Sequence, residues 1–121
     1  MHSSRREPGA SGLVAAGALL AAAAVGLSAY AAHGVDGDAR SGLQTAAVFA
    51  FGHGVALAAL ARGARRTLTA VALLSLLLGT LLFSGALVSR YLLQGPSMFA
   101  PWGGMLTILG WTLYAIDALR R

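Results

Sequence analysis

The chain has 121 residues, of which 57% are hydrophobic and 11% charged, and it contains no cysteine. So few polar residues cannot coat a soluble core, and the lack of cysteine excludes disulfides, thiolate metal sites and thiol nucleophiles. The formal net charge of +5 comes from arginines that lie between apolar stretches, which excludes the continuous basic face that a nucleic-acid partner would need. The sequence therefore predicts an integral membrane protein whose first partner is the lipid bilayer.

Four apolar stretches follow one another along the chain. Each is close to the roughly 20 residues that a helix needs to cross the hydrocarbon core. We predict an all-α fold, a four-helix transmembrane bundle, in a single membrane domain over residues 12–119. Its helices cover about residues 12–32, 42–61, 68–89 and 101–119. A cytoplasmic tail (1–11) precedes the domain, and a basic C-terminal end (120–121) follows it.

Arginines gather on one side of the predicted membrane. The tail, the middle loop and the C-terminus carry Arg5, Arg6, Arg62, Arg65, Arg66, Arg120 and Arg121, whereas the opposite side has Arg40 and Arg90. Because short loops rich in arginine stay in the cytoplasm, both termini are predicted to be cytoplasmic. All basic residues except histidine are arginine, and Ala and Gly are abundant. This composition indicates a GC-rich bacterial genome, so we expect the bacterial cytoplasmic (inner) membrane.

The first stretch carries small residues at intervals of four, namely Ala18, Ala22 and Gly26. Such a stripe lets a neighbouring helix backbone approach closely, so we expect it to face the packed interior. The stretch is longer than a usual signal-peptide core and three further stretches follow, so we expect it to be retained. Residues 33–40 are rich in Gly and Asp, which predicts a turn segment.

The second stretch has a longer stripe of small residues at the same interval. It consists of Gly42, Ala46, Ala50, Gly54 and Ala58. We expect this face to pack against protein. His53 lies beside the stripe, roughly 16 Å along the helix from Gly42 and therefore near the bilayer centre. It is the deepest ionisable group that the sequence predicts.

The last two stretches combine small residues with groups typical of a membrane surface. Helix-packing positions here are Gly79, Gly85, Gly103 and Gly104. Arg90 can extend its side chain to the surface beside Tyr91. Pro101 suits the first turn of a helix, where its missing N–H costs nothing. Asp117 and Arg121 are one helical turn apart and are expected to pair.

Several short motifs occur in order across the four stretches. They are Leu27–His33, Gln44-Thr45, His53, Leu78-Gly79-Thr80, Leu82–Gly85, Pro101-x-Gly-Gly and Gly110-Trp111. In this order the motifs resemble the small four-helix membrane proteins of domain-of-unknown-function family 423. The chain has Phe49 and Ala50 where that family usually has a Tyr-Gln pair. The resemblance implies a fold and a membrane location, and it carries no established reaction.

Four polar residues are candidates for a functional role. They are His53, His33, Ser84 and Arg90. An ionisable residue inside a membrane suggests a site, but a neutral histidine can also bridge two helices by hydrogen bonding. For His53 we expect the bridging role, and the partners we expect within its reach are Ser84, Thr80 and Thr107. A proton or ligand site at His53 is the alternative.

The remaining polar groups lie near the ends of the stretches. His33 with Asp36 predicts a cap or loop contact, because His33 and His53 lie at depths too different for one metal ion. Arg90 is expected to anchor at the surface, and the alternatives are pairing with Asp36 or Asp38 or binding a lipid phosphate. No catalytic triad spacing, pair of intramembrane carboxylates or phosphate-binding loop occurs. We therefore expect no enzyme activity, no metal and no cofactor.

The pattern favours a small non-enzymatic accessory or assembly subunit. Its small-residue faces would pack against another membrane protein or against further copies in a homo-oligomer. The alternative is an oligomeric channel or transporter in which His53 is an intramembrane polar gate.

Overall fold

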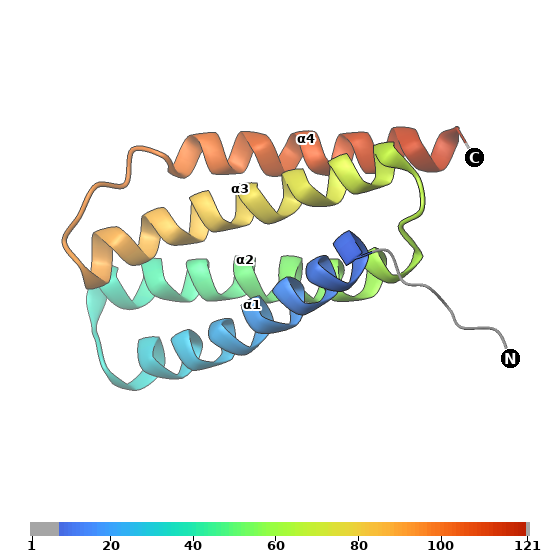
Figure 1. Ribbon diagram of the computed structural model, residues 1–121. Coiled ribbons are helices and arrows are strands. Elements are labelled where there is room, and N and C mark those ends of the chain that lie inside the picture. The colour runs from blue at the N-terminus through green and yellow to red at the C-terminus, as the bar shows by residue number, and fades with distance from the viewer. Residues whose placement is uncertain (1–7, 121) are drawn as a thin grey trace, which may run out of the picture.

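Four helices make up the part of the chain that the computed structural model describes, residues 8–120 (Figure 1). They are α1 (Pro8–His33), α2 (Gly37–Leu60), α3 (Thr67–Leu92) and α4 (Ala100–Leu119), with the one-turn 3₁₀ helix η1 (Ala61–Gly63) after α2. Residues 8–120 contain no strand. The all-α fold with four helices is therefore confirmed.

Two helices begin earlier than the sequence predicts. Asp36 takes an extended backbone, with φ of −130° and ψ of 170°, and α2 begins directly after it at Gly37. Gly37 has φ of 61°, a conformation that glycine adopts without steric cost. The connection is therefore residues 34–36, and the prediction of a turn up to Arg40 is wrong. Helix α1 begins at Pro8, inside the predicted tail, whose residues 1–7 lie outside the described residues.

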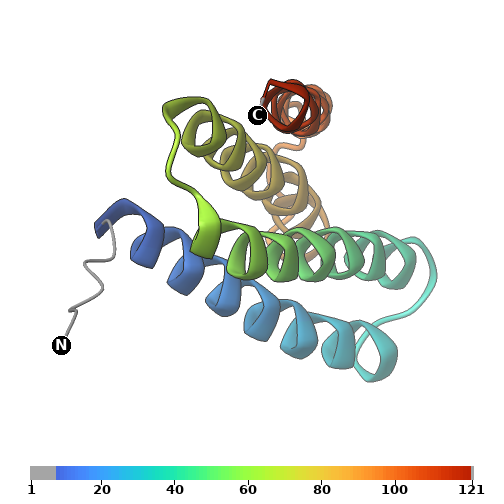
Figure 2. The same cartoon turned by 90° about the vertical axis from the view of Figure 1, so that its right-hand side faces the viewer.

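The helices pack in chain order and form an open array rather than a closed bundle. Helix α1 lies along α2, α2 along α3, and α3 along α4. Helices α1 and α4 lie on opposite sides of the molecule and share no substantial interface (Figure 2). Both hairpins therefore keep one broad face that no other helix of this chain covers.

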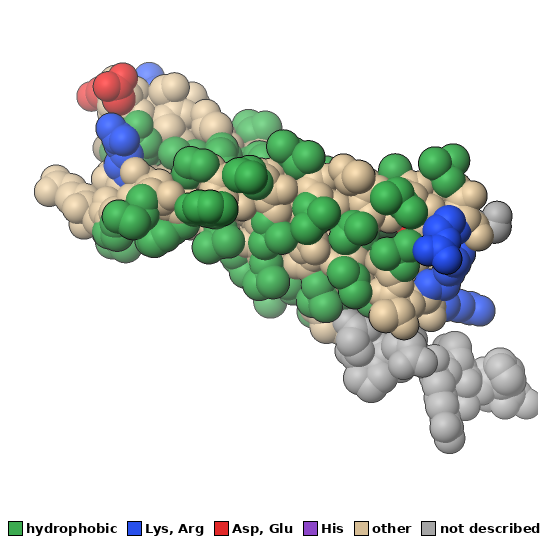
Figure 3. Space-filling model, turned by 90° about the horizontal axis from the view of Figure 1, so that it is seen from above, with side chains coloured by type: hydrophobic (Ala, Val, Ile, Leu, Met, Phe, Trp, Pro, Cys, Tyr) green, Lys and Arg blue, Asp and Glu red, His purple; other side chains and the backbone are tan. Residues whose placement is uncertain are grey.

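The polarity of the molecule is reversed relative to a soluble protein. Buried polar side chains are Thr69, Ser75, Thr80, Ser84, Thr107 and Asp117. Large apolar side chains are exposed on every helix, for example Leu19, Val48, Leu78 and Ile108. Hydrophobic side chains cover the middle of the face drawn in Figure 3, and arginines lie at its two ends. Such a surface is stable in lipid, so the chain is a membrane protein.

Three segments of the described chain are long and apolar enough to cross a membrane. They are Ser11–His33, Gly37–Gly63 and Thr67–Leu92. Helix α4, which contains Asp117 and several Gly, Thr and Trp residues, is not among them. Its polar Thr107 and Asp117 are nevertheless buried, while Trp102 and Ile108 are each 67% exposed. The outer face of α4 is therefore apolar, like the outer faces of the other helices.

Each hairpin has a pair of glycines where its two backbones come closest. A methyl group added at Gly17 would lie 2.5 Å from the carbonyl oxygen of Gly54, and one at Gly54 would lie 2.7 Å from that of Gly17. Gly79 and Gly103 are related in the same way, at 2.8 and 2.7 Å. No side chain fits at these four positions, so glycine is needed there for close packing.

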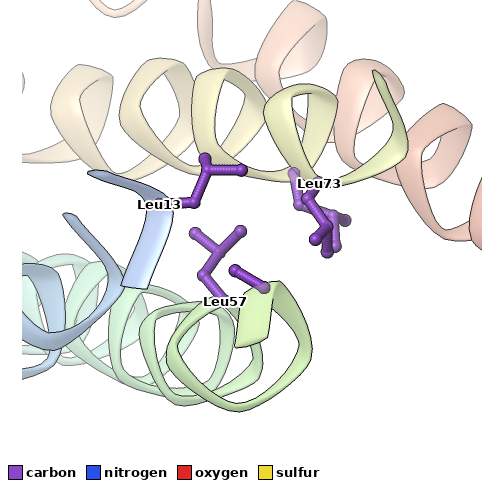
Figure 4. Packing of buried hydrophobic residues seen from close by; sticks show 5 residues of the cluster. Leu13, Leu57 and Leu73 are labelled. Carbon is purple, nitrogen blue, oxygen red and sulfur yellow. The ribbon is translucent and has the colours of Figure 1, made fainter. Parts of the chain in front are cut away.

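A small apolar core joins three of the helices near the end of the molecule where α1 begins. Leu13 from α1, Leu57 from α2 and Leu73 from α3 point toward one another (Figure 4). Ala61 of η1 and Leu76 complete this cluster. The core therefore fixes how the first hairpin meets α3.

The predicted packing positions divide into two groups. Buried positions are Ala46, Ala50, Gly54, Gly79 and Gly103, whereas Ala18, Ala22, Gly26 and Gly85 are exposed and Gly104 is half-buried with open space around it. The prediction that the α1 stripe faces the interior of the molecule is therefore wrong. Helix α1 packs on α2 through Leu13, Gly17, Ala24 and Ala31 instead. Small residues occur all around α1, so spacing alone does not identify its packed face.

Candidate functional site

His53 lies three residues past the middle of the Gly37–Gly63 segment, so it lies deep in the membrane. Its Nδ1 is 2.8 Å from the carbonyl oxygen of Phe49, and Trp111 Nε1 donates to its Nε2 at 3.0 Å. Because an indole N–H can only donate, Nε2 must accept, and the proton of the neutral ring lies on Nδ1. Both ring nitrogens of His53 are therefore engaged, and the histidine bridges α2 and α4.

Aromatic rings surround this bridge. The Phe49 ring lies 4.3 Å from the His53 ring and 4.4 Å from that of Phe83 on α3, measured between centroids. On α4, Trp111 and Tyr114 meet edge to face at 6.2 Å. Three helices thus contribute to one cluster, which we call the His53 cluster (Phe49, His53, Phe83, Trp111 and Tyr114). It joins the two hairpins at mid-depth, and no feature of the sequence indicated Trp111 as the partner of His53.

Ser84 is not part of this cluster. Its hydroxyl donates to the carbonyl oxygen of Ala46 at 2.8 Å, and Ala46 is about 10 Å along α2 from His53 at 1.5 Å per residue. Thr80 and Thr107 donate to carbonyls of their own helices. The prediction that His53 bonds Ser84, Thr80 or Thr107 is therefore wrong. Ser84 and His53 do not form a pair for nucleophilic chemistry.

His33 and Arg90 lie at the opposite end of the molecule from η1. His33 is exposed at the last residue of α1. The guanidinium of Arg90 lies 5.3 Å from the ring centroid of Tyr91, and Asp36 pairs with Arg40 at 3.2 Å. The alternative pairing of Arg90 with Asp36 or Asp38 is absent from residues 8–120, and the expected anchoring of Arg90 at the membrane surface stays a prediction. The four predicted polar candidates do not form a common site.

Asp117 is a polar site that sequence reasoning did not select. Its side chain is completely buried, the hydroxyl of Thr69 donates to its Oδ2 at 2.5 Å, and Arg66 Nε lies 3.4 Å from its Oδ1. The sequence paired it with Arg121, which lies outside the described residues. The sequence did contain a signal for this contact. Asp117 lies in an apolar stretch that is predicted to end on the same side of the membrane as the arginine-rich middle loop. This contact ties the start of α3 to the end of α4.

An apolar groove of about 590 Å³ lies on the outer side of the first hairpin. Its lining residues from α1 are Ala24, Val25, Ser28, Ala29 and Ala32, and those from α2 are Ala47, Val48, Phe51 and Gly52. The groove has no charged lining residue. Residues 8–120 also contain no group of three His, Asp or Glu side chains that could hold a metal ion.

Comparison with known proteins gives one match. The model of a family described as "Protein of unknown function (DUF423)" matches residues 27–115. That range includes the whole His53 cluster but ends before Asp117. No curated protein and no solved structure matches the chain.

Proposed function

The chain belongs to the DUF423 family of proteins of unknown function, and we propose that it is a non-enzymatic accessory or assembly subunit of a bacterial cytoplasmic membrane. It acts by packing helices against another membrane protein or against a second copy of itself. The observation that carries this proposal is the outer face of α1, which we define by Ala18, Ala22 and Gly26. These small residues are exposed in the part of the chain that the structure describes.

Helix association in lipid depends on close packing, because lipid tails remove the hydrophobic drive between apolar helices. A stripe of small residues favours such packing, and the stripe on α1 continues along the helix toward the apolar groove. A methyl group added at Gly26 would meet no atom of this chain within 4 Å. The outer face of α1 therefore has room for a helix that this chain does not supply.

The test is native mass spectrometry of the tagged protein extracted gently from its own membrane. We expect a stoichiometric complex that Gly26→Leu removes, since the larger side chain holds the partner backbone away. Gly104→Leu is the matched control, because Gly104 on α4 also has open space around it. Gly54→Leu is unsuitable, because it would disrupt the first hairpin itself. A complex that survives Gly26→Leu together with Ala22→Leu would contradict the proposal.

We further propose that both termini are cytoplasmic. The start of α1, the α2–α3 connection and the end of α4 lie at one end of the molecule (Figure 1). The connection carries Arg62, Arg65 and Arg66, and the positive-inside rule assigns such an end to the cytoplasm. Reporter fusions at the two ends of the chain test this topology.

The alternative function, a channel or transporter gated by His53, makes a different prediction. Hydrogen bonds to both ring nitrogens of His53 support a bridging role instead. A clean homo-oligomer whose proton or solute flux in proteoliposomes disappears in His53→Ala would favour transport over the accessory role.

A further inference from the structure

The end of the molecule where the α2–α3 connection meets the last turn of α4 carries exposed arginines. We call the surface formed by Arg62, Arg65 and Arg120 the arginine end. All three residues are exposed. The ion pair of Arg66 with Asp117 holds the connection against α4, and Arg120 follows Asp117 by three residues. Arginine side chains gather at this end in Figure 3.

Arg66 differs from the arginines of this surface in what it contacts. Its charge is compensated by the buried carboxylate of Asp117. Within residues 8–120, the side chains of Arg62, Arg65 and Arg120 form no ion pair or hydrogen bond. The arginine end therefore presents three cations that no acidic group of the described chain neutralises.

The opposite end of the molecule is balanced. It contains two arginines, Arg40 and Arg90, and two aspartates, Asp36 and Asp38, so its charges cancel. Arg40 is paired with Asp36. Arg90 lies against the Tyr91 ring. The two ends therefore differ in net charge, although both lie where helices leave the hydrocarbon core.

The chemistry beside the arginine end indicates the ligand. A guanidinium group matches phosphate oxygens in geometry and charge. Leu119, directly before Arg120, is 86% exposed, and Ile116 one turn earlier is 41% exposed. A ligand that satisfies both features has an anionic phosphate at the membrane surface and acyl chains below it.

We propose that the arginine end binds the headgroups of anionic phospholipids through Arg62 and Arg65, with Arg120 beside them. The acyl chains lie along the outer face of α4. The ligand class is a phospholipid with net negative charge, such as phosphatidylglycerol. This binding rests on the membrane location of the chain and is independent of the proposed accessory role.

Native mass spectrometry of the purified protein in mild detergent tests the proposal, with phosphatidylglycerol or phosphatidylcholine of identical acyl chains added. We expect wild type to retain phosphatidylglycerol preferentially. The double variant Arg62→Gln/Arg65→Gln should bind it about 30-fold more weakly, which corresponds to about 1 kcal/mol for each arginine near an anionic surface. The double variant Arg40→Gln/Arg90→Gln removes the same charge from the opposite end and should bind as wild type does.

Three results would overturn the proposal. One is equal retention of the two lipids by wild type, and another is equal loss of binding in both double variants. The third is displacement of bound phosphatidylglycerol by millimolar inorganic phosphate, because that would identify a site for small anions. Circular dichroism of each variant checks that the helices are intact, which matters most for the control, because Arg40 is half-buried and bonds Val35 and Asp36.

Discussion

The first hairpin (α1 and α2) and the second hairpin (α3 and α4) share one packing feature and differ in their polar contacts. Each has a reciprocal pair of glycines at its closest approach, Gly17 with Gly54 and Gly79 with Gly103. Among residues 11–63, no side-chain hydrogen bond joins α1 to α2. Between α3 and α4, Thr69 donates to the buried carboxylate of Asp117. The first hairpin is therefore held by close apolar packing, whereas the second also has a polar contact that fixes its register.

The largest expected effect comes from removing backbone proximity in the first hairpin. Gly54→Leu should lower the free energy of unfolding by about 3 kcal/mol or more, because overpacking cannot be relieved against the α1 backbone. Thermal unfolding in a mild detergent measures the loss. Gly52→Leu is the control, since a methyl group at Gly52 meets nothing within 4 Å. Equal losses in the two variants would show that the Gly17–Gly54 contact does not hold this hairpin.

A smaller effect should come from the polar contact of the second hairpin. Thr69→Val keeps the side-chain shape but removes the donor to Asp117, and a hydrogen bond to a charged group contributes about 2 kcal/mol. Thr112→Val is the matched control, because Thr112 is exposed and bonds only its own helix. If the two variants unfold at the same temperature, the Thr69–Asp117 contact does not stabilise the second hairpin. The two hairpins would then be held by packing in the same way.

The smallest effect should come from the bridge between the hairpins. Trp111→Phe removes the hydrogen bond to His53, and such bonds between membrane helices average about 0.6 kcal/mol. Trp102→Phe at an exposed position serves as control. Nitrogen NMR of labelled histidine gives a sharper readout, because the structure requires the proton of neutral His53 on Nδ1. A spectrum with the proton on Nε2 would contradict the Trp111 bond.

Helix α2 shows what the sequence could predict and α1 shows what it could not. On α2 the small residues Ala46, Ala50 and Gly54 lie opposite bulky ones such as Val48 and Phe51, so the packed face is distinct. On α1 small residues occur on every side, and the chosen stripe proved to be the exposed one. Periodicity identifies a face only when the opposite face differs in size.

The site partners needed tertiary information. The sequence predicts His53 as a deep ionisable group, but its partner Trp111 is 58 positions away. Asp117 is predicted from the sequence to pair with Arg121, four positions on, whereas its hydrogen bond with Thr69 spans 48 positions. The hydropathy pattern likewise does not indicate which helices are neighbours in space. Membrane location and helix number therefore follow from local pattern, whereas pairing between helices does not.

Packing in chain order has a consequence for how the protein is made. Every helix of the array packs mainly on the helix synthesised just before or after it, so contacts between helices that are not consecutive are few. Low contact order favours rapid folding, and each interface can form as soon as its second helix leaves the ribosome. Helix α4 emerges last, and its Asp117 then meets Thr69 and Arg66 at the start of a helix that has already been made. The buried carboxylate of Asp117 thus enters the membrane with its hydrogen-bond donor and its counter-ion already present at the start of the preceding helix.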